Sequence, residues 1–104
     1  LSAKTERSPM LIFSKHAIQR ALDMAVEPEE IQDAIHRPDR IGWSPKYGNE
    51  LWTAGRVTLA VAEQGDDEVV VTILWSSERA WRDDYEIAPM PEGRKSRRTM
   101  FIPQ

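Results

Sequence analysis

Apolar residues recur along this chain in two rhythms, a three- to four-residue rhythm near the start and a two-residue rhythm in the middle. The first rhythm covers residues 14–25, where one helical side is apolar and consists of Ile18, Ala21, Leu22 and Ala25. The opposite side carries His16, Arg20 and Asp23. Ser14 stands at the natural N-cap position. We therefore predict a helix that packs through its apolar side and leaves His16 and Arg20 to solvent or a ligand.

A second helix is predicted between residues 28 and 37. Pro28 suits a first helical turn, and Glu29 and Glu30 lie near the positive end of the helix dipole. Its apolar side consists of Ile31, Ala34 and Ile35. Pro38 ends the pattern. Both helices are short, so we expect them to need a sheet to pack on.

The two-residue rhythm predicts strands at residues 51–54, 56–62 and 68–75. The last of these is apolar on both faces, which is typical of a central strand. Weaker signals indicate an edge strand near residues 40–43, and a short strand or helix-anchoring segment at residues 10–13. The predicted class is α+β, with two N-terminal helices packed on a three- to four-stranded antiparallel sheet.

The chain is short enough for a single domain, which we place at residues 10–88. Residues 1–9 are polar and are expected to form a flexible extension. A short helical turn is predicted over residues 76–82, with Trp81 and Tyr85 reaching back to the body. Residues 89–104 are predicted to be a basic tail that buries none of its own surface. Its apolar end at residues 100–102 leaves three alternatives open: docking on this body, on a second copy or on a partner.

Composition narrows the function classes. The chain has no cysteine, which excludes disulfides and thiolate chemistry and is compatible with a reducing cytoplasm, where we expect the protein to be. No apolar run is long enough to span a membrane. Residues 10–88 carry 8 Lys and Arg against 15 Asp and Glu, an acidic balance that argues against tight nonspecific nucleic-acid binding. Two histidines on different helices give no metal-ligand spacing, so we expect no metal and no cofactor.

His16 and Arg20 are the sharpest chemical signal. They lie four residues apart, which places a proton-transfer group one helical turn from a phosphate-binding group. The competing interpretation is an ordinary solvated helix face, in which Arg20 pairs with Asp23 or Glu27.

Residues 11–75 resemble the small toxin-like ribonucleases of the barnase–EndoU–colicin–RelE superfamily, and most closely the BrnT-type toxins and related phage and bacterial proteins. The resemblance rests on His16-Ala17 with Arg20, an acidic helix ending at residues 37–40, an inner strand from Arg56, and residues 70–75. One departure is Met24, which stands where such proteins commonly carry a second arginine.

The resemblance implies a metal-independent endoribonuclease. Cleavage of RNA needs a proton-transfer group and cations for the charge that develops on phosphorus. The implied catalytic residues are His16, Arg20 and Arg56. Substrate binding is assigned to Lys46, Tyr47 and Thr72. RNA is then the expected substrate, and an antitoxin or host protein the expected partner.

An alternative from another class stays open. The acidic body and the arginine missing at Met24 favour a non-catalytic binding module with a degenerate ribonuclease fold. Such a module would engage a host protein or form a homodimer through its acidic surface and apolar-ended tail. A DNA-binding helix-turn-helix is disfavoured, because the second helix is acidic where a recognition helix would meet phosphates.

Overall fold

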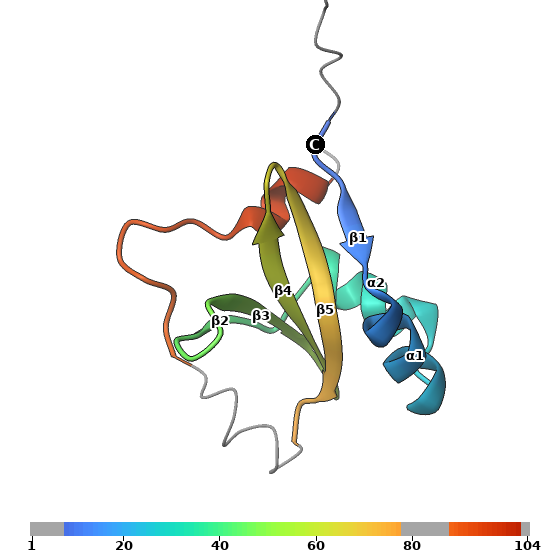
Figure 1. Ribbon diagram of the computed structural model, residues 1–104. Helices are drawn as coiled ribbons and strands as arrows, with labels where there is room; N and C mark the ends of the chain where they lie inside the picture. The colour runs from blue at the N-terminus through green and yellow to red at the C-terminus, as the bar shows by residue number, and fades with distance from the viewer. Residues whose placement is uncertain (1–7, 78–87, 103–104) are drawn as a thin grey trace, which may run out of the picture.

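The computed structural model describes residues 8–77 and 88–102 (Figure 1). Its elements, in chain order, are β1 (Leu11–Phe13), α1 (Lys15–Asp23), α2 (Pro28–His36), β2 (Arg40–Ser44), β3 (Asn49–Ala54), β4 (Val57–Gln64), β5 (Asp67–Trp75) and the 3-10 helix η1 (Arg97–Phe101). The predicted α+β class, the two helices and the weakly signalled edge strand β2 are confirmed. The helical turn expected at residues 76–82, with Trp81 and Tyr85, lies mainly outside the described residues.

The sheet has five strands in the order β1-β5-β4-β3-β2. Strands β2 to β5 form an antiparallel meander, whereas β1 pairs with β5 in parallel. The prediction of three or four purely antiparallel strands was therefore wrong in strand number and in the direction of β1. The reason is long-range pairing, since Leu11 lies opposite Glu68 and no local pattern reports so distant a partner.

The core lies on the face of the sheet that meets the helices. Trp52 is paired with Leu59 and Leu59 with Ile73, so three fully buried side chains form a row across β3, β4 and β5. Ala17 of α1 and Ile35 of α2 join the same cluster. Burial of each large apolar side chain contributes about 1.5–3 kcal/mol, so this row holds both helices on the sheet.

The rotation of α1 differs from the prediction. Ile18 and Leu22, expected in the core, are 51% and 70% exposed, while Ala17 and Met24 are buried. Arg20, expected on the solvent side, is half-buried. The helix therefore turns a different side to the sheet from the one that its apolar residues indicate.

The cause is the anchoring of α1 to the edge of β5. Ser14 caps the helix by accepting from the Ala17 amide, and its hydroxyl donates to the Val71 carbonyl at 3.1 Å. One helical turn later the Nε of Arg20 donates to the carbonyl of Ile73 at 3.0 Å. Strand β1 pairs with β5 only as far as Val70. Beyond that point the side chains of Ser14 and Arg20 bond the backbone carbonyls of β5 instead.

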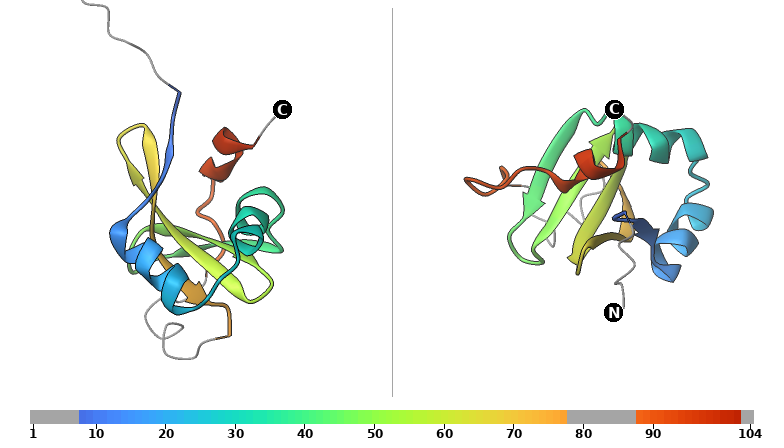
Figure 2. Two further views of the ribbon diagram at one scale, coloured as in Figure 1. Left: turned by 90° about the vertical axis from the view of Figure 1, so that its right-hand side faces the viewer. Right: turned by 90° about the horizontal axis from the view of Figure 1, so that it is seen from above.

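The C-terminal segment also departs from the prediction of a basic tail that buries no surface. Arg94, Ser96 and Arg97 all bind Glu50 of β3, and Phe101 packs against the core. Figure 2 shows η1 beside α2. Of the three alternatives for the apolar end, docking on this same body is the one observed. The segment is held because buried carboxylates on the sheet attract its arginines.

Candidate functional site

Two of the three residues predicted to be catalytic contact the last part of β5, and the third lies on the same helix as one of them. The Nε of Arg20 donates to the Ile73 carbonyl. Two residues further, the guanidinium carbon of Arg56 lies 4.8 Å from the centroid of the Trp75 ring. His16 is exposed and precedes Arg20 by one helical turn. Two arginines thus contact the last residues of β5, and a histidine lies on α1 one turn from the first of them.

Arg56 is placed by a tight turn and by α2. Gly55, at φ +57°, and Arg56 form the two-residue connection between β3 and β4, a turn that requires a left-handed backbone. The guanidinium of Arg56 donates to both carboxylate oxygens of Glu30, at 2.6 and 2.9 Å. These bonds, together with a backbone hydrogen bond at Glu27, lower the pKa of Glu30 to about 2. The same pair raises the pKa of Arg56.

This ion pair predicts a pH dependence of stability. The pKa of Glu30 is about 2 in the folded chain against an ordinary 4.5, so its carboxylate stabilises the fold above pH 4.5. The contribution is lost as the pH falls from 4.5 through about 2. We measure the free energy of unfolding with urea at several pH values in this range. It should fall less steeply with decreasing pH in Glu30→Gln than in the wild type. Glu29→Gln, an exposed change on the same helix, is the control and should keep the wild-type slope.

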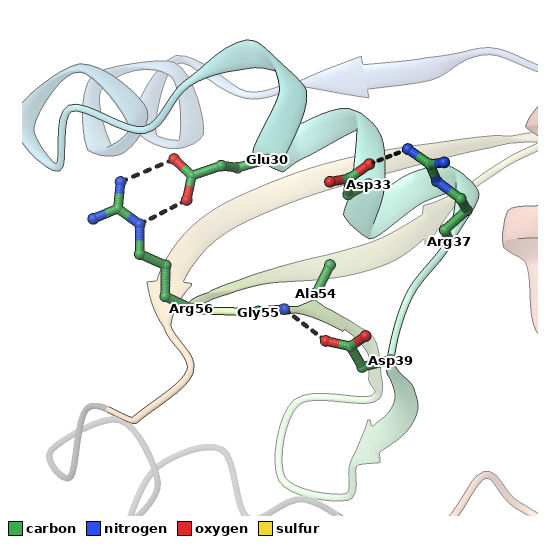
Figure 3. Close-up of a pocket in the computed structure, with 7 residues that line it drawn as sticks. All are labelled: Glu30, Asp33, Arg37, Asp39, Ala54, Gly55 and Arg56. Atoms are coloured by element: carbon green, nitrogen blue, oxygen red, sulfur yellow. Dashed lines mark hydrogen bonds and ion pairs between the residues drawn. The ribbon is translucent and has the colours of Figure 1, made fainter.

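A polar cavity of about 420 Å³ opens between α2 and the β3–β4 turn (Figure 3). It is lined by Glu30, Asp33, Arg37, Asp39, Ala54, Gly55 and Arg56. Each of its carboxylates accepts from a donor on the wall. Arg56 donates to Glu30, Arg37 donates to Asp33 at 2.8 Å, and the Gly55 amide donates to Asp39 at 2.7 Å. With three carboxylates against two guanidinium groups, the cavity disfavours an anion inside it.

The predicted substrate-binding residues lie elsewhere. Lys46 and Tyr47 occupy the turn between β2 and β3, with the ammonium of Lys46 5.2 Å from the Tyr47 ring centroid. Arg56 follows the other end of β3, and six residues of strand separate the two sites by about 20 Å. Thr72 is buried and neighbours Ile73, whose side chain belongs to the helix-facing core, so Thr72 points to the opposite face of the sheet. These three residues do not join His16, Arg20 and Arg56.

Two residues of the site escaped the sequence analysis. Glu30 was interpreted only as a complement to the helix dipole, because its partner Arg56 lies 26 positions away in the chain. Trp75 was assigned no role in the site and was predicted as the end of the strand at residues 68–75. Its pairing with Val57, the neighbour of Arg56, is a long-range contact that no local pattern of the sequence reports.

Comparison of the chain with protein-family models, curated proteins and solved structures finds no match. Among residues 8–77 and 88–102, no group of three or more His, Asp or Glu is arranged to bind a metal ion. Within that same part of the chain no helix is both long and apolar enough to cross a membrane.

Proposed function

We propose that this protein is a toxin-like endoribonuclease that cleaves RNA without a metal ion. The observation that carries the proposal is the placement of Arg20 and Arg56 on Ile73 and Trp75 at the end of β5, with His16 one helical turn before Arg20. RNA cleavage by the 2'-hydroxyl needs proton transfer and stabilisation of charge on the phosphate. A histidine next to two arginines provides groups of both kinds.

Each residue has a distinct role in the proposed reaction. His16 transfers the proton, because it is the imidazole of the set and is exposed on the first turn of α1. The bond from Arg20 to the Ile73 carbonyl orients its guanidinium along the strand. Arg56 meets the phosphate after leaving Glu30. The exchange takes the Arg56 guanidinium out of the cavity, whose carboxylates disfavour an anion, and solvent reaches the pair because the side chains of Arg56 and Glu30 are 56% and 24% exposed.

The direct test is cleavage of a labelled single-stranded RNA by the purified protein in the presence of a chelator. We expect the wild type to cleave, and Arg56→Ala to cleave about 100-fold more slowly because one group that stabilises charge on the phosphate is lost. Arg40→Ala is the matched control, since Arg40 is an exposed arginine at the start of β2, away from Trp75. Equal cleavage by Arg56→Ala and the wild type, with both folded by circular dichroism, would contradict the proposed role of Arg56.

A second candidate function is a non-catalytic binding module. It is favoured by an apolar groove of about 370 Å³ between α1 and α2, lined by Phe13, Ile18, Ala21, Leu22, Val26, Pro28, Ile31 and Gln32. Such a groove suits the apolar face of a partner's amphipathic helix. Three acidic residues lie at the facing ends of the two helices, namely Asp23, Glu27 and Glu29. They favour a partner helix that carries basic residues beside its apolar face. Failure of the wild type to cleave either free or ribosome-bound RNA would favour this candidate.

A further inference from the structure

Two fully buried glutamates lie under the C-terminal segment, at the end of the sheet opposite Trp75. Glu50 belongs to β3 and Glu68 to the start of β5, and both side chains face the helices. Glu50 accepts four hydrogen bonds, from Trp52 Nε1 at 2.9 Å, an Arg94 terminal nitrogen at 3.1 Å, Ser96 Oγ at 2.7 Å and the Arg97 amide at 3.0 Å. Three of these four donors come from residues 94–97, so the segment binds Glu50 much as a peptide ligand would.

Glu68 supplies a second carboxylate with spare accepting capacity. The Nε of Arg97 forms an ion pair with its Oε2 at 3.0 Å, and neither carboxylate oxygen has a hydrogen-bond partner among the described residues. Burial raises the pKa of Glu68, against the opposing effect of Arg97. A carboxylate in this position gains from any further cation that reaches it.

Glu63 extends the acidic surface toward solvent. It is 49% exposed, and its carboxylate lies 3.8 Å from both Arg94 and Arg97. Glu50, Glu63 and Glu68 come from three adjacent strands, and we refer to them together as the acidic floor. The floor is therefore part of the sheet, while the arginines that cover it belong to a chain end.

The covering segment is attached mainly by side chains. No helix or strand lies between Ala88 and η1, and Gly93 adopts a positive φ of 84° just before the first arginine. Arg94 stacks on Trp43 of β2, 4.7 Å from the ring centroid. The floor thus binds two arginines three positions apart, Arg94 and Arg97, and Ser96 between them.

We propose that the acidic floor is a peptide-binding site for arginine-rich segments with Arg-x-x-Arg spacing, filled here in cis by residues 94–98 and open to such a segment of a partner protein. Because residues 94–98 belong to the same chain as the floor, their effective concentration at the floor is about millimolar. A partner's segment therefore binds only once the contacts of residues 94–98 are weakened. This inference is independent of the ribonuclease proposal. The floor lies at the start of β5, whereas Arg20 and Arg56 contact the other end of that strand.

The test uses a fluorescently labelled peptide with the sequence of residues 92–104. Fluorescence anisotropy should show that it binds the full-length double variant Arg94→Ala/Arg97→Ala at least about tenfold more tightly than the wild type, whose floor is already occupied. A peptide carrying the same two alanines should not bind. A peptide with Lys95→Ala should bind like the original, because Lys95 is exposed.

A folding control keeps the result decisive. Circular dichroism is recorded for each variant, and Arg94→Ala alone, which retains the Arg97 to Glu68 pair, replaces the double variant if that one does not fold. The proposal is overturned if the peptide binds no folded variant, or if it binds the wild type and the variant equally. The proposal is also overturned if the alanine-substituted peptide binds as tightly as the original peptide. Binding to the floor would then not depend on the two arginines.

Discussion

Replacing His16 with alanine should slow RNA cleavage by about 100- to 10,000-fold, the contribution typical of a positioned proton-transfer group. His16 is exposed on the first turn of α1, so its removal leaves the core untouched. The free energy of unfolding should therefore stay within about 0.5 kcal/mol of the wild-type value. The measurement pairs initial cleavage rates, taken with chelator present, with urea unfolding of the same preparations.

The matched control for this prediction is His36→Ala. His36 is the only other histidine of the chain, and it is exposed in the last turn of α2. It should cleave at the wild-type rate. If His16→Ala retains wild-type cleavage, or if His36→Ala loses as much, proton transfer by His16 is excluded and the binding-module function gains support.

Replacing Glu50 with alanine should destabilise the fold by about 3–5 kcal/mol, because the change leaves buried cationic and polar partners without their acceptor. The side chain is fully buried and serves donors from Trp52 and from residues 94–97. Glu50→Gln should fall between the wild type and Glu50→Ala, since the amide oxygen still accepts hydrogen bonds but carries no charge. Urea unfolding midpoints give the three free energies.

Glu63→Ala is the control for this effect. Its carboxylate belongs to the same acidic floor but is half exposed, so the loss should be only about 0–1 kcal/mol. If Glu50→Ala lowers the free energy of unfolding no more than Glu63→Ala does, the buried hydrogen bonds of Glu50 do not hold the C-terminal segment.

The helix bounds were predictable because their signals are local. Ser14 caps α1, Pro28 begins α2, and Pro38 follows its end. Each of these residues acts on the backbone within one turn of itself, so the printed sequence contains all the information required. The alternation of apolar residues likewise placed β3, β4 and β5 close to their observed bounds.

The rotation of α1 and the buried acids were not predictable in the same way. Ile18 and Leu22 outweigh Ala17 in hydrophobicity, yet the bonds of Ser14 and Arg20 to β5 decide which side meets the sheet. Glu50 was not recognised as buried because the predicted strand began at residue 51, and charged residues are normally exposed. A local signal existed, since Glu50 lies two residues before Trp52 and therefore shares its face.

The bonds of Ser14 and Arg20 to β5 also affect whether strands of other chains can pair with the sheet. A strand edge with open carbonyls is a template on which other chains polymerise. Beyond β1, the carbonyls of Val71 and Ile73 are already taken by Ser14 and Arg20. An incoming strand would have to displace a capped helix before it could pair there. These bonds thus protect this stretch of β5 against edge-to-edge pairing, and variants that weaken either bond are expected to be more prone to fibril formation.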